Sequence, residues 1–114
     1  MSLSNLRIDR DRLMSQLSHL AEIGAIDNGG CCRLALSDED KAGRDLVVSW
    51  MKELGLQVHV DAIGNVIALR AGREAGPPVM TGSHIDTVRT GGRDRKSTRL
   101  NSSHIQKSRM PSSA

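Results

Sequence analysis

The segment from Val79 to Gly92, VMTGSHIDTVRTGG, constrains the fold more than any other part of the sequence. Its short apolar run follows the Pro77-Pro78 pair, is typical of a buried strand, and changes abruptly to small and polar residues. In open α/β sheets, ligands bind beyond the carboxyl ends of the strands, and His84 and Asp86 fall where this strand would end. The segment therefore predicts a strand of an α/β sheet with chemistry at its tip.

His84 and Asp86 form a His-x-Asp pair. An imidazole can ligate a metal ion through one ring nitrogen while a nearby carboxylate orients the ring or its neighbours. Such pairs are common, so on its own this one would mark a metal site in about one case in ten. The surrounding sequence has to decide between a metal ligand and an ordinary polar pair.

Three stretches around the pair point to one family. They are GSHIDTVRTGG at 82–92, DAIGNVIALRAG at 61–72 and NGGCCRLALSDEDKAGRDL at 28–46. Together they resemble the dinuclear zinc amidohydrolases of the carboxypeptidase-like metallopeptidase superfamily, and most of all the branch of N-carbamoyl-L-amino-acid hydrolases and allantoate amidohydrolases. The resemblance covers Leu6 to about Arg93.

Details of the motif favour the carbamoyl and ureido branch. The peptidase branches usually carry GHxDxVP, whereas here Ser83 precedes His84, Thr87-Val88 follow Asp86, and Gly91-Gly92 come next without a proline. A carboxypeptidase or aminoacylase fragment is the first alternative. The second is a non-enzymatic small α/β module with a basic tail, which salt-dependent nucleic-acid binding would support.

The resemblance implies that the parent protein hydrolyses a non-peptide C–N bond in N-carbamoyl amino acids, allantoate or related ureido compounds. His84 corresponds to the first metal ligand, and Asp86 to the catalytic carboxylate that supports the metal site. Two Zn²⁺ ions per intact catalytic domain, or Mn²⁺, Co²⁺ or Ni²⁺, would polarise the carbonyl and activate a bridging water. The partners implied are a small-molecule carbamoyl or ureido substrate and a second subunit in a homodimer.

The chain departs from the family after Gly92. The family continues with an aromatic-Asp-Gly triplet whose Asp bridges the metals, but that position falls on Arg95, and a guanidinium cannot ligate zinc. Residues 94–104, DRKSTRLNSSH, match a translated short-read sequencing adapter, and 105–114 continue in the same frame. We therefore expect a catalytic-domain fragment at 1–93 and a non-native disordered tail at 94–114. The alternative for this segment is a basic nucleic-acid-binding tail.

The missing downstream ligands and general base predict that this chain is inactive and binds no metal tightly, because a catalytic zinc usually takes three protein ligands.

The charge of the chain indicates which partners to expect. The chain has 16 Lys plus Arg and 13 Asp plus Glu, and from Asp94 onward it has five basic residues and one acid. The remaining 11 basic and 12 acidic residues give a net charge of −1, and Trp50 is the only aromatic. Neither nucleic acid nor an anionic membrane is expected as a partner.

Cys31 and Cys32 are adjacent, so they have neither CxxC spacing nor the usual geometry of a structural disulfide. We interpret them as loop cysteines of a reducing compartment. The N-terminus has no apolar signal region and no segment reaches the length of a membrane span, which predicts a cytoplasmic protein.

The predicted fold class is α/β, the N-terminal portion of a zinc-peptidase-like catalytic domain with two helices and about three strands. One amphipathic helix runs near 8–23, presents Leu13, Leu17, Leu20 and Ala21 on one face, and ends at Gly24. The second starts at Ser37 as N-cap and stops at Gly55. Its predicted buried stripe is Leu46, Val47, Trp50, Met51 and Leu54.

The alternation of Leu56, Val58 and Val60 predicts a strand, and 66–69 predicts a second one joined to it by a turn at 61–65. The Val79 run supplies the third. His19 and His59 have no partner at metal-ligand spacing and are predicted to be surface or packing residues.

Overall fold

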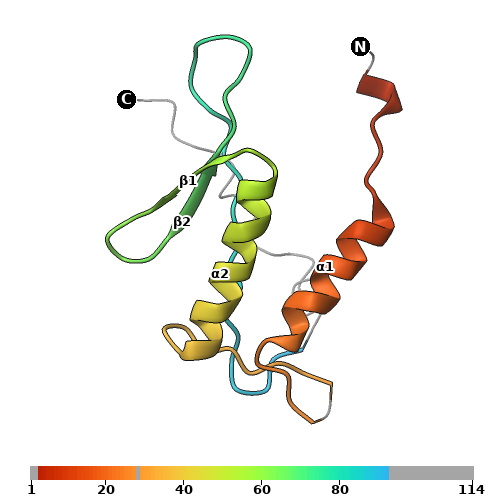
Figure 1. Cartoon of the computed structure of the whole chain (residues 1–114), viewed down its shortest axis with the longest axis vertical. Helices are drawn as coiled ribbons and strands as arrows, with labels where there is room; N and C mark the ends of the chain where they lie inside the picture. Colours follow the sequence, from red (N-terminus) through yellow and green to blue (C-terminus); the bar gives the residue numbers. More distant parts are fainter. Residues whose placement is uncertain (1–2, 28, 93–114) are drawn as a thin grey trace.

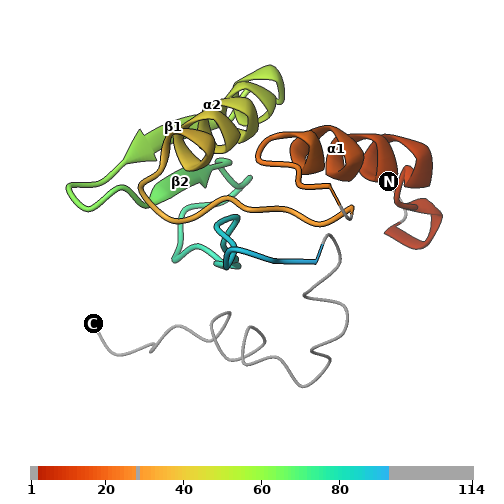
Figure 2. The ribbon, with the colours of Figure 1, turned by 90° about the horizontal axis from the view of Figure 1, so that it is seen from below.

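The computed structural model describes residues 3–27 and 29–92, so the predicted tail at 94–114 lies outside the described residues. The elements in chain order are a short 3-10 helix η1 (Leu3–Asn5), helices α1 (Arg10–Glu22) and α2 (Asp38–Glu53), and strands β1 (Gln57–Val60) and β2 (Val66–Leu69). Helix α2 lies across the β1–β2 hairpin, and α1 stands to one side of it (Figure 1, Figure 2). Within these described ranges, no helix is long and apolar enough to cross a bilayer.

Helix α1 forms where the sequence predicts it. The Asp9 side chain caps it by accepting a hydrogen bond from Arg12 N–H at 3.0 Å, and Gly24 follows its end at a φ of +84°. Its apolar face is only partly covered, since Leu13 and Leu17 are 44% and 52% exposed. One contact across to α2 is the His19 ring, which packs edge-on against Trp50 with centroids 6.1 Å apart.

Helix α2 confirms the predicted cap and the predicted stop. Ser37 Oγ accepts from Asp40 N–H at 3.2 Å, three acidic residues fill the first turn, and Gly55 follows the helix at a φ of +78°. Four of the five predicted stripe residues are half-buried, but Leu54 is 70% exposed. Leu54 is the C-cap, so it lies at the position where the helix ends.

The predicted hairpin is confirmed. Strands β1 and β2 pair antiparallel with Val58 opposite Ala68 and Val60 opposite Val66, on the face that α2 packs against. The turn at 61–65 closes on the Asp61 carboxylate, which accepts hydrogen bonds from Ile63 N–H and Asn65 N–H at 3.0 and 2.8 Å.

The prediction of a third strand at the Val79 run is wrong. Between Val79 and Gly92 no strand forms, Val79 is 95% exposed, and the contacts that do form are an isolated bridge from Gly91 to Cys31 and single bonds to the 31–33 segment. A strand exists only through pairing with a neighbour, and the two-stranded sheet of the described residues does not extend to this run. The described chain supplies no neighbouring strand for this apolar run, so the predicted strand does not form.

Candidate metal and catalytic site

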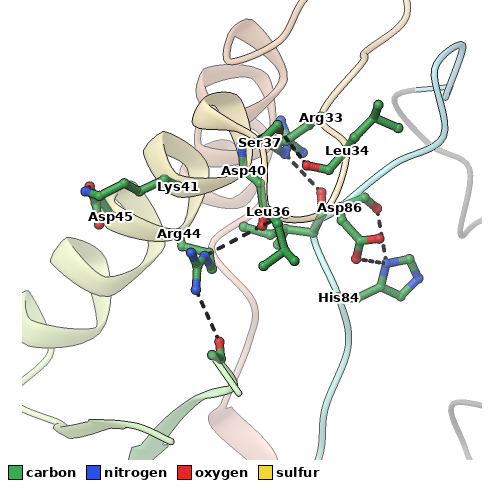
Figure 3. Close-up of polar contacts among 12 residues, drawn as sticks. Arg33, Leu34, Leu36, Ser37, Asp40, Lys41, Arg44, Asp45, His84 and Asp86 are labelled. Atoms are coloured by element: carbon green, nitrogen blue, oxygen red, sulfur yellow. Dashed lines mark hydrogen bonds and ion pairs between the residues drawn. The ribbon is translucent and has the colours of Figure 1, made fainter. Parts of the chain in front are cut away.

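His84 and Asp86 do come together, as the motif predicts. His84 Nδ1 lies 3.0 Å from Asp86 Oδ1 and 3.1 Å from the Asp86 backbone oxygen. The two side chains are 35% and 42% exposed, so the pair sits at a surface and can be reached from solvent. Figure 3 shows the imidazole ring against the carboxylate.

These two contacts fix which ring nitrogen carries the proton. A backbone carbonyl oxygen can only accept a hydrogen bond, so Nδ1 must be the donor, and Asp86 Oδ1 accepts from the same N–H. With the proton on Nδ1, the lone pair of a neutral imidazole is on Nε2. This is the tautomer that a carboxylate imposes on a histidine that ligates metal through its other nitrogen.

The segment that carries the pair is held by residues 31–33, which lie more than fifty positions earlier in the chain. Thr87 N–H donates to Arg33 O at 2.7 Å, and Arg33 N–H donates to Thr87 Oγ1 at 2.7 Å. Further along, Cys31 and Gly91 exchange two backbone hydrogen bonds at 2.7 and 3.0 Å. Residues 31–33 therefore do the anchoring that a neighbouring strand would do.

The pair opens into a pocket of about 310 Å³ between α2, the hairpin turn and residues 83–86. Its polar wall on α2 is made by Asp40 and Arg44. The Arg44 Nε lies 3.7 Å from Asp40 Oδ2, and Arg44 Nη1 donates to Gly64 O at 3.3 Å, which ties the helix to the hairpin turn (Figure 3). Thus His84 and Asp86 line the same cavity as the Asp40–Arg44 ion pair.

The residues present fit a metal centre as part of a ligand set. His84 offers an imidazole in the appropriate tautomer, with Asp86 supporting it. Among residues 3–27 and 29–92 no group of three or more His, Cys, Asp or Glu side chains is placed to hold one ion. A catalytic zinc usually takes three protein ligands, so the others would have to come from outside the described residues.

The other candidates take no part in the site. His59 is exposed on β1 and His19 packs on Trp50. Cys31 is buried and Cys32 is half-buried, and both are free thiols. The sequence reasoning missed Arg33 and Thr87, which sit in loops without periodicity. The only signal they offered was that both belong to the stretches that carry the family resemblance.

No family model matches the chain. By sequence, it is 44% identical over 92 residues to an N-carbamoyl-L-amino-acid amidohydrolase of Pseudomonas sp. (strain NS671) and 41% identical over 86 residues to one of Geobacillus stearothermophilus. These matches cover 80% and 75% of this chain and 22% and 21% of the relatives. It is also 35% identical over 82 residues, 71% of this chain and 17% of the relative, to a ureidoglycolate hydrolase of Oryza sativa.

Solved structures agree with the sequence matches. A hydantoinase/carbamoylase family amidase from Burkholderia vietnamiensis superimposes with a TM-score of 0.76 at 53% identity, over 78% of this chain and 22% of that chain. One from Burkholderia ambifaria gives a TM-score of 0.75 at 49% identity, over 77% of this chain and 22% of that chain.

The proteins that match by sequence and by structure are amidohydrolases and amidases. The chain belongs to the hydantoinase/carbamoylase family and corresponds to the N-terminal part of its members. It spans about a fifth of the length of the relatives it matches. The predicted carbamoyl and ureido branch is thereby confirmed, and the carboxypeptidase or aminoacylase alternative is not favoured.

Proposed function

We propose that the intact protein hydrolyses a non-peptide C–N bond in an N-carbamoyl amino acid or a related ureido compound. The observation that carries this proposal is the 44% identity to an N-carbamoyl-L-amino-acid amidohydrolase, in a chain whose His84–Asp86 pair has the geometry of a supported metal ligand. The same relatives support a small-molecule carbamoyl or ureido substrate.

In this proposal each site residue has a distinct task. His84 would ligate one of two divalent ions through Nε2, while Asp86 would hold the ring by accepting from Nδ1–H. The ions, Zn²⁺ or alternatively Mn²⁺, Co²⁺ or Ni²⁺, supply Lewis acidity and lower the pKa of a bound water when present. Asp86 also fixes the direction in which the imidazole presents its lone pair.

The test is hydrolysis by the full-length gene product of an N-carbamoyl amino acid, with an N-acyl amino acid and a dipeptide as competitors. His84→Ala should abolish turnover, and Asp86→Asn should weaken metal affinity or activity by about 10- to 100-fold. His59→Ala is the matched control, because this exposed β1 histidine lies outside the site. Faster turnover of the dipeptide would refute the substrate class.

We further propose that the 114-residue chain itself is inactive and holds no metal tightly. A single imidazole is not a catalytic zinc site, and the general base of the family lies downstream. The measurement is metal content and ureido hydrolysis of the purified chain. Stoichiometric bound zinc, or turnover above that of His84→Ala, would contradict the proposal.

Partners and location form a separate proposal. The parent would be a cytoplasmic homodimer without nucleic-acid or membrane partners. The net charge of −1 over residues 1–93 supports the expectation about nucleic acid and membranes, and the free Cys31 and Cys32 thiols support a reducing compartment. The homodimer is proposed from the family resemblance alone. Sedimentation of the full-length protein with and without duplex DNA or anionic vesicles tests it, and co-sedimentation with either one would contradict it.

Residues 94–114 lie outside the described residues, and we propose that they are translated adapter fused to a genuine fragment at 1–93. Independent sequencing of the locus past the Gly92 codon decides this. Recovery of an aromatic-Asp-Gly continuation is expected, and the same DRKSTRLNSSH ending in genomic DNA would refute it.

A further inference from the structure

Arg33 is buried, with only 5% of its surface exposed. Within the described part of the chain, no carboxylate lies within 4.0 Å of its guanidinium, in contrast to Arg44, which is paired with Asp40. Burying a charge without a countercharge is costly unless hydrogen bonds replace the lost water. The groups that receive its hydrogen bonds therefore indicate what this arginine is for.

Its acceptors are backbone carbonyls from two separate segments and, at 3.3 Å from Nη1, the sulfur of Cys31. Nη1 donates to Leu20 O at 2.9 Å and to Ile23 O at 2.7 Å, at the C-terminal end of α1, where the helix dipole has its negative end. Leu20 O also accepts from Ile23 N–H, the C-cap of the helix. Nε donates to Ile85 O at 2.9 Å, between the two site residues. One side chain thus joins the end of α1 to the segment that carries the site.

The Arg33 backbone holds the other side of Asp86. Its N–H and C=O are both bonded to Thr87, so residues 85 and 87 are fixed while residue 86 between them points its carboxylate to His84. Asp86 contributes two acceptors to His84, a side-chain oxygen and its own backbone oxygen. The orientation of that peptide consequently depends on the bonds to Arg33 on either side.

Helix α2 leaves room for this arginine. Gly43 is a buried mid-helix glycine, and a Cβ at that position would lie 2.9 Å from Arg33 Cδ and 3.4 Å from Ile85 Cδ1. Glycine inside a helix costs about 1 kcal/mol relative to alanine. Glycine is needed at this position because Arg33 and Ile85 occupy the space that a side chain would fill.

We propose that Arg33 is a positioning residue for the site: by holding Ile85 O and Thr87 it sets the Asp86 peptide and carboxylate that keep the proton of His84 on Nδ1. Arg33 touches neither reacting group, so it acts through Asp86. The catalytic meaning of this inference rests on the proposed function, but the geometry belongs to this chain and can be measured without metal or substrate.

The experiment is ¹⁵N NMR of the metal-free full chain at one alkaline pH. The two ring shifts give the ratio of the Nδ1–H to the Nε2–H tautomer. Arg33→Met should lower that ratio by about tenfold, the order expected when a charge-assisted hydrogen bond is lost. Arg33→Lys, which keeps the charge without the planar fork, should restore only part of it.

Arg7→Met is the matched control. It removes an exposed arginine that also binds backbone carbonyls, those of Ser4 and Leu6, and that does not line the pocket of the site, so it should leave the tautomer ratio unchanged. An unchanged ratio in folded Arg33→Met, or an equal shift in Arg7→Met, would overturn the proposal.

Gly43→Ala decides the matter if Arg33→Met does not fold, because it displaces Arg33 without removing any of its groups. It should shift the same ratio in the same direction and speed hydrogen exchange of Thr87 N–H. A folded Gly43→Ala chain with the original ratio and exchange rate would overturn the proposal. Metal binding by the parent is measured separately, so failure of the positioning role and failure of the proposed function give different results.

Discussion

Thr87 and Arg33 bind each other in both directions: the Thr87 N–H donates to Arg33 O, and the Thr87 hydroxyl accepts from Arg33 N–H, each at 2.7 Å. The hydroxyl proton can go to Val88 O at 2.7 Å or Cys31 O at 3.1 Å. Thr87 is therefore the point where the site segment is fastened to the rest of the chain.

Thr87→Val removes this hydroxyl with little change in shape. We expect it to lower the free energy of unfolding by about 1–2 kcal/mol, because a part-buried Arg33 N–H loses its acceptor. Urea denaturation measures the loss. Thr81→Val, at an exposed position of the same segment, should change stability by less than about 0.5 kcal/mol. Equal losses in the two variants would contradict the fastening role.

Gly24 and Gly29 make a matched pair for backbone strain, with φ of +84° and +82°. A Cβ on Gly24 would meet the Cys32 backbone oxygen, whereas a Cβ on Gly29 would meet nothing within 4 Å. We expect Gly29→Ala to cost about 1–2 kcal/mol from the left-handed backbone alone. Gly24→Ala should cost about 1–3 kcal/mol more from the clash. Urea midpoints of the two variants test this, and similar midpoints would show that the 24–32 contact gives way easily.

The contribution of the Ser37 cap to stability can be distinguished from the general effect of replacing a serine in a helix. Ser37 Oγ accepts from Asp40 N–H and donates to Leu34 O, whereas Ser49 Oγ donates to Leu46 O within the same helix. Ser37→Ala should lower stability by about 1 kcal/mol. Ser49→Ala should be neutral or slightly stabilising, because alanine is the better helix former. Thermal unfolding followed by circular dichroism distinguishes them, and a larger loss for Ser49→Ala would contradict the cap.

Lowering the pH should weaken the hairpin turn, because the turn closes on the Asp61 carboxylate. The Asn65 side chain, then the Asn65 backbone, and also Ile63 and Gly64 N–H bind this carboxylate and lower its pKa below the ordinary 3.8. A carboxyl with a lower pKa in the folded state stabilises above its unfolded pKa and loses that contribution as pH falls through the folded one.

We therefore expect Asp61→Asn to reduce the free energy of unfolding at neutral pH. The difference between this variant and the unsubstituted chain should shrink as pH drops below 3.8. Unfolding curves at pH 7, 4 and 2 measure it. Asp45→Asn is the control, because its pair with Lys41 is exposed and surface pairs contribute little. A difference that stays constant down to pH 2 would show that the charge of Asp61 is not responsible.

Local signals predicted most of the fold. Ser37 and the acidic turn placed the start of α2, Gly24 and Gly55 placed two helix ends, and the alternation from Leu56 placed the hairpin. Each depends on residues within a few positions of one another, where capping and periodicity act directly. For the same reason the His84–Asp86 contact, an i,i+2 pair, followed from the motif.

The failures all concern contacts that sequence periodicity does not encode. The Val79 run has the composition of a strand, but pairing requires a neighbour that the described chain does not supply. Leu54 fits the helical spacing but lies at the C-cap. Arg33 gave no sign of being buried, because arginine is rarely buried and its acceptors are distant carbonyls.

The bonds that fasten the site segment join positions 52 to 60 residues apart, whereas the helices and the hairpin close over a few residues. During synthesis, Arg33 leaves the ribosome well before Thr87 has been made. The hydrogen bonds between Arg33 and the site segment can therefore form only after that later segment has been synthesised. Closing so long a loop comes after the local elements and is undone before them as denaturant rises. We therefore expect the tip that carries His84 to become ordered after the helices and the hairpin, and to be lost before them.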